Sequence, residues 1–108
     1  MLVRYSVEVD SFWQRLQQVP ADQRQYQQYE ERYQEIVLNI QVLLKQNQMR
    51  TNNEESIKQT QNLLKLWQQD KLKHQRNDGF KDFLINRRLD QYQRMFAALL
   101  AAEDAKNI

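Results

Sequence analysis

Apolar residues along most of the chain recur at steps of three and four, which is the spacing of one face of an α-helix. Between about residue 21 and residue 49 this face comprises Tyr26, Tyr29, Tyr33, Ile36, Ile40 and Leu43. A second such segment runs from near Phe80 toward the C-terminus and carries Ile85, Leu89, Tyr92, Phe96 and Leu99. These steps are those of heptad a and d positions, so they predict long helices packed side by side.

Two further helices are predicted between and before these segments. A broad apolar face after Glu54 predicts a helix that ends at Gly79, the residue expected to take the left-handed backbone conformation. Phe12, Trp13 and Leu16 predict a short helix before Pro20, because proline suits the first turn of the next helix. The predicted fold class is therefore all-α: an antiparallel bundle of three long helices plus a short N-terminal helix, forming one domain over residues 1–108.

Residues 2–9 follow a different pattern, because Val3, Tyr5, Val7 and Val9 alternate with polar residues. A period of two is typical of a strand or an extended arm. A lone strand has no partner inside a helical chain, so an arm packed on the bundle or a strand paired across a dimer would be needed. The other interpretation is that the first helix simply starts earlier, and both stay open at this point.

The composition agrees with a small number of long helices, and it limits the cellular location and the kinds of cross-link that we expect. Glycine and proline each occur once, so turn-forming residues are scarce, and cysteine is absent, which excludes disulfides and thiolate metal sites. No apolar run approaches the roughly 20 residues that a membrane span needs. Residues 1–10 lack the apolar segment of a signal peptide. We therefore expect a cytoplasmic protein with no membrane contact.

Candidate catalytic groups are few. The only histidine, His74, lies in a polar stretch, and Asp70 is the one nearby carboxylate at helical spacing from it. We expect these two to form a solvated i, i+4 contact. One glycine cannot build a phosphate-binding loop, and no Glu-x-x-His pair of a diiron bundle occurs. The sequence thus predicts no catalytic residue, no metal site, no cofactor and no small-molecule substrate, and a protein that is not an enzyme.

Three tyrosines begin the face that continues as isoleucine and leucine in the second helix. Each offers a large apolar ring with a hydroxyl that needs a partner or water, which suits an interface or the rim of a core. One interpretation packs them against the first helix and the bundle end, with their hydroxyls in solvent. The other makes them part of a binding surface, since several further apolar residues lie off the main faces and exceed what the bundle needs.

The predicted function is therefore a protein–protein interaction module: an adaptor, an assembly or secretion-type chaperone, or a regulatory inhibitor. Its partner is another protein or a second copy of the chain, in a homodimer. The predicted partner-binding residues are Tyr26, Tyr29, Tyr33, Leu38, Val42 and Leu66.

Positive charge in the second half of the chain supports an alternative. The net charge is only +2, but residues 58–94 carry nine basic and four acidic side chains. A nucleic-acid accessory factor could use the surface of residues 65–94 to follow a phosphate backbone. The candidate residues are Lys71, Lys73, Arg76, Lys81, Arg87, Arg88 and Arg94. Against this alternative, aspartates are interleaved, and the aromatic residues of the last helix are expected in its core face rather than exposed for base stacking.

Overall fold

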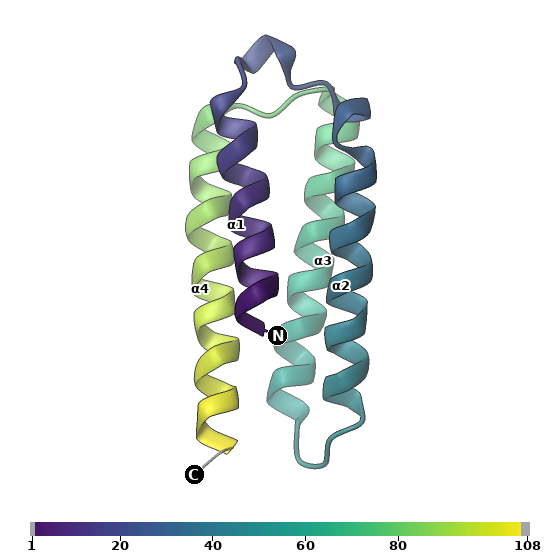
Figure 1. The fold of residues 1–108 in the computed structure, drawn as a ribbon, viewed down its shortest axis with the longest axis vertical. Coiled ribbons are helices and arrows are strands. Elements are labelled where there is room, and N and C mark those ends of the chain that lie inside the picture. The colour runs from purple at the N-terminus through teal and green to yellow at the C-terminus, as the bar shows by residue number, and fades with distance from the viewer. Residues whose placement is uncertain (1, 107–108) are drawn as a thin grey trace.

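Residues 2–106, which the computed structural model describes, form four α-helices that run alternately up and down (Figure 1). The helices are α1 Leu2–Gln18, α2 Glu30–Gln48, α3 Glu54–Asn77 and α4 Asp82–Lys106. Two short 3-10 turns, η1 Ala21–Gln23 and η2 Tyr26–Gln28, connect α1 to α2. The described residues contain no strand, and they form a rod of 48 × 20 × 18 Å. The predicted all-α antiparallel bundle is confirmed.

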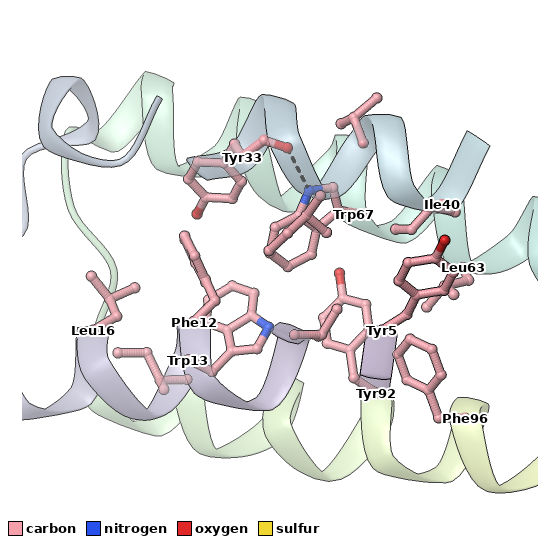
Figure 2. Close-up of a cluster of buried hydrophobic side chains, with 14 of the residues drawn as sticks. Tyr5, Phe12, Trp13, Leu16, Tyr33, Ile40, Leu63, Trp67, Tyr92 and Phe96 are labelled. Carbon is pink, nitrogen blue, oxygen red and sulfur yellow. Dashed lines mark hydrogen bonds between the residues drawn. The ribbon is translucent and has the colours of Figure 1, made fainter. Parts of the chain in front are cut away.

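The bundle consists of two helix pairs with a shared core. α1 packs mainly against α4, and α2 packs mainly against α3 (Figure 1). All four helices contribute a fully buried aromatic side chain to the centre: Trp13, Tyr33, Trp67 and Tyr92 (Figure 2). Phe12 meets the Trp67 ring edge-on at 5.1 Å between ring centroids, a favourable arrangement for aromatic pairs. Over residues 2–106, no helix combines the length and apolar character needed to cross a membrane.

Residues 2–9 are the first turns of α1, so the extended-arm interpretation is wrong. Their alternation resolves into two pairs spaced four residues apart, and such pairs share a helix face. Tyr5 and Val9 face the core, whereas Val3 and Val7 are exposed on the other side of α1. A helix satisfies its own backbone hydrogen bonds, which a lone strand could not do here.

The ends of α2 and α3 differ from the prediction. α2 begins at Glu30 rather than near residue 21, because Arg24 turns its side chain into the bundle and the Tyr26 N–H donates to Oδ1 of Asp78 at 2.8 Å. These contacts between distant segments replace the bonds of a continuous helix. At the end of α3, Asp78 rather than Gly79 takes the left-handed conformation, with φ of 47°. Aspartate is among the residues that tolerate this region best.

Candidate functional site

The tyrosines at the start of α2 lie inside the bundle. Tyr33 is fully buried, with its ring centroid 4.6 Å from that of Phe12 and 5.2 Å from that of Trp67 (Figure 2). Tyr26 is also buried, and Tyr29 is half-buried against the core. Tyr29 and Tyr33 therefore pack against Phe12 of the first helix, as one interpretation predicted, whereas Tyr26 packs against Tyr33 and His74. Tyr26 and Tyr33 form no part of an open surface, so the prediction that they bind a partner is wrong.

The hydroxyl of Tyr33 reaches a buried histidine rather than solvent. It lies 2.7 Å from Nδ1 of His74, and Nε2 of His74 lies 2.7 Å from the carbonyl oxygen of Arg24. A carbonyl only accepts, so Nε2 carries the proton and Nδ1 accepts from Tyr33. Burial lowers the pKa of His74, which favours the neutral ring. Both ring nitrogens are thus already bonded within the bundle.

The expected solvated contact between Asp70 and His74 is wrong, because both side chains are buried and bond to other residues. Asp70 accepts from the Tyr92 hydroxyl and from Nε of Arg88, each at 2.7 Å. Burial raises the pKa of Asp70, and these two hydrogen bonds oppose that shift. The carboxylate therefore joins α3 to α4 within the core.

Arg24 is a buried residue that sequence reasoning missed. Its guanidinium donates to the carbonyl oxygens of Val19, Phe80 and Gln17 at 2.8, 2.7 and 3.1 Å, and to Oδ1 of Asp82 at 2.7 Å. These bonds tie the end of α1 to the loop before α4. No helical periodicity surrounds Arg24, since it lies between two 3-10 turns, so the apolar pattern gave no signal for its burial.

An apolar stripe remains on the outer face of α2. Leu38 is 62% exposed, Val42 46% and, just beyond the helix, Met49 78%. Their spacing of four and seven residues places them on one face, opposite the buried Ile36 and Ile40. We call Leu38, Val42 and Met49 the α2 stripe. Two of its members belong to the predicted set, and Met49 could have been found from its position seven residues after Val42.

Leu66, the remaining member of the predicted set, does not join this stripe. It is half-buried and packs against the core from α3. Its position off the main face of α3 suggested exposure, but its side chain still contacts the core. The structure therefore keeps Leu38 and Val42 together on an open surface and separates them from the other four predicted residues.

The predicted basic residues also divide into two groups. Arg88 is bonded to buried Asp70, and Arg94 pairs with Asp90 at 2.6 Å. Among the described residues, the remaining five make no ion pair, and they lie on α3, on α4 or in the loop between them: Lys71, Lys73, Arg76, Lys81 and Arg87.

Apolar side chains accompany these cations. Phe83 is 58% exposed, which corrects the expectation that the aromatic residues of α4 all face the core, and Leu72 is 50% exposed. A hollow of about 580 Å³ is lined in part by Lys73, Lys81 and Phe83.

Within residues 2–106, no group of three or more histidine, aspartate or glutamate side chains is placed to hold a metal ion. Comparisons with protein-family models, with curated proteins and with solved structures find no match to this chain. The functional assignment therefore depends on the chain's own residues. The two candidates are the α2 stripe and the surface around Lys71, Lys73, Arg76, Lys81 and Arg87, which we call the basic surface.

Proposed function

We propose that the protein is a non-enzymatic protein–protein interaction module that docks through the outer face of α2. The observation that supports this function is the α2 stripe, an apolar face on a helix whose other side is already buried in the core. Covering apolar surface stabilises a complex by about 25 cal/mol per Å² removed from water. A helix with a second apolar face is therefore suited to hold a partner helix.

The other exposed apolar residues make weaker candidates. Val3 and Val7 form a single pair on α1, and Leu72 and Phe83 lie among unpaired cations. Within the described part of the chain, only the α2 stripe brings three such residues onto one face, and their spacing follows a heptad. Its inner face is held in the core, so a partner would meet a surface already formed and the cost of ordering on binding would be small.

The bonding of the ionisable groups also supports a binding role over a catalytic one. A general acid needs a proton that can reach a substrate, and a general base or a nucleophile needs a lone pair that can do so. His74 and Asp70 are the groups with shifted pKa values that the sequence offered, and both are engaged in hydrogen bonds inside the bundle. Their geometry suits holding helices together. An adaptor, an assembly or secretion-type chaperone, and a regulatory inhibitor all fit this role, in the cytoplasm.

Affinity capture from native lysate tests the proposal. The tagged wild type is compared with a Leu38→Asp/Val42→Asp variant and with Leu72→Asp, a control that adds a charge at an exposed leucine on α3. A partner protein should be recovered with the wild type and the control and lost with the double variant, while circular dichroism shows unchanged helicity. Recovery of the same partner by the double variant would contradict docking through α2.

A nucleic-acid accessory function is the second candidate, supported by the unpaired cations beside exposed Phe83. Such a surface could stack one base and follow a phosphate backbone. The test is fluorescence anisotropy with a labelled single strand at increasing salt, for the wild type and for Arg76→Glu/Arg87→Glu. Affinity that falls steeply with salt and is lost in the variant would favour this function. Binding that is absent, or unchanged by the variant, would reject it.

A further inference from the structure

Charged residues lie on the same face of α2 as the α2 stripe, two before it and one between Val42 and Met49. Glu31, Glu35, Leu38, Val42, Lys45 and Met49 follow steps of four, three, four, three and four along the chain. They therefore occupy successive a and d positions of one outward-facing heptad seam. The N-terminal half of this seam is acidic, its centre is apolar, and Lys45 gives its C-terminal half a positive charge. Reversing a second copy of this seam brings Leu38 opposite Val42 and Glu35 opposite Lys45.

We propose that the α2 stripe binds the α2 stripe of a second copy of this chain, with the two helices antiparallel. Leu38 then faces the partner's Val42, and Glu35 faces the partner's Lys45. Two-fold symmetry makes each of these contacts twice. This inference names the partner of the proposed docking surface and so rests on the proposed function.

Charge selects the antiparallel direction. In a parallel pair with the same seam, Glu35 would face the partner's Glu35 and Lys45 would face the partner's Lys45, which is unfavourable for both pairs. The antiparallel pair replaces both repulsions with attractions. It also joins a positions to d positions, with Leu38 and Val42 at the centre, the Glu35–Lys45 pairs on either side, and Glu31 and Met49 at the two ends.

The same residues select the register. Sliding one helix by a heptad in either direction places Leu38 opposite the partner's Glu35, or Val42 opposite the partner's Lys45. Each shift removes a charged side chain from water without an ion-pair partner, which costs free energy. The proposed register avoids both contacts at the centre of the seam. Its one apolar–charged contact, between Glu31 and the partner's Met49, lies at the ends of α2, where the exposed glutamate can stay in water. This register also overlaps the two helices along nearly their whole length, since its centre lies near the middle of Glu30–Gln48.

The residues of the seam are available for this pairing. Lys45 makes no ion pair among the described residues, and it is exposed. Glu35 pairs with Arg32 on the same helix at 2.8 Å, with 57% of the glutamate side chain and 37% of the arginine side chain exposed. Such surface pairs contribute little stability, so they do not prevent a new contact. One helix from each subunit buries an area at or below about 1,200 Å², and the dimer is therefore a weak, reversible one.

Sedimentation equilibrium across a concentration series tests the inference with charge-reversed variants. Glu35→Lys alone and Lys45→Glu alone should each weaken dimerisation about tenfold, because each places like charges opposite each other twice. The double variant Glu35→Lys/Lys45→Glu should recover wild-type association, and so should a 1:1 mixture of the two single variants. Lys58→Glu makes the same charge change on the exposed side of α3 and should have no effect.

A wild type that stays monomeric at millimolar concentration would overturn the inference, and so would single variants that dimerise as the wild type does or a double variant that fails to recover. These outcomes are separate from those of the proposed function. A monomer whose capture of another protein still depends on Leu38 and Val42 keeps the function and rejects the dimer. A dimer that responds to charge reversal but captures no other protein keeps the inference and rejects a wider adaptor role.

Discussion

The Tyr33 hydroxyl donates a hydrogen bond to Nδ1 of His74, 2.7 Å away, and so links α2 to α3 at a fully buried position. The same histidine donates from Nε2 to the carbonyl oxygen of Arg24, the residue that closes the α1–α2 connection. One neutral side chain thus holds three segments of the chain together. All three residues are buried, so a polar group that lost its hydrogen bond here would have no water to replace it and the folded state would be destabilised.

Replacing Tyr33 by Phe should destabilise the protein by about 1–3 kcal/mol, because the substitution leaves Nδ1 of His74 buried without a donor. Urea unfolding followed by circular dichroism measures the change. Tyr29→Phe is the matched control, since Tyr29 is only half-buried and its hydroxyl makes no hydrogen bond among the described residues. Equal unfolding free energies for the Tyr33 variant and the wild type would show that the bond is not formed in solution.

Acidification should destabilise the bundle through His74. Its pKa in the folded protein lies below the ordinary value of 6.5, so below pH 6.5 the unfolded chain binds a proton more readily than the folded chain does. Stability should therefore fall as the pH drops from 6.5 toward the folded-state pKa, by up to about 1.4 kcal/mol per pH unit. His74 is the only histidine, so a loss of stability that begins near pH 6.5 can be assigned to its side chain. Urea unfolding midpoints between pH 7.5 and pH 5 give the measurement.

The carboxyl group of Asp70 acts in the opposite direction. Its folded-state pKa is raised above 3.8, so its contribution favours the folded protein at low pH and is lost as the pH rises through that raised value. Repeating the pH series in an Asp70→Asn background should therefore leave the loss attributed to His74 in place or make it steeper. A stability that does not change between pH 7.5 and pH 5 in both backgrounds would contradict a buried neutral histidine.

Arg88 and Arg94 should differ sharply although both are arginines on α4 that pair with an aspartate. Arg88→Met leaves the buried carboxylate of Asp70 without its cation and should cost about 3 kcal/mol. Arg94→Met breaks an exposed pair with Asp90 and should change stability little. Thermal unfolding of both variants provides the comparison. Similar losses in the two would mean that Asp70 is not held in the core.

Arg24→Lys should also destabilise, by about 2 kcal/mol or more, although charge is retained. An ammonium group cannot reproduce the planar fork that reaches three carbonyl oxygens and Asp82 together. Arg15→Lys, at an exposed position near the end of α1, is the matched control and should be nearly neutral. A neutral Arg24→Lys variant would indicate that the bundle end opens to water in solution.

The helical bundle could be predicted from the sequence because apolar spacing is a local property of each helix. Ile36, Ile40 and Leu43 lie in the core as their periodicity indicates. Periodicity was ambiguous in α1, where Val3 and Val7 lie on a second face. There, a helix with an outer pair of valines gives the same alternation as a strand.

The buried polar residues could not be predicted in the same way. His74 lies in a polar run, and its burial depends on Tyr33 and Arg24, which are 41 and 50 positions away in the chain. Arg24 likewise depends on Phe80 and Asp82. Partners at such separations leave no local pattern, so these side chains resembled an ordinary solvated surface. Leu38 and Val42 could be found, because their distance from the core face is again a local property of the helix.

Amide chemical shifts of the ¹⁵N-labelled protein, recorded as it is diluted and as any captured partner is added, locate the docking surface residue by residue. Docking through α2 predicts changes concentrated at Glu35, Leu38, Val42, Lys45 and Met49, with the amides of the basic surface on α3 and α4 unmoved. Changes confined to the segment from Leu72 to Arg87, with α2 unaffected, would contradict docking through α2 and place the binding surface at the cations around Phe83.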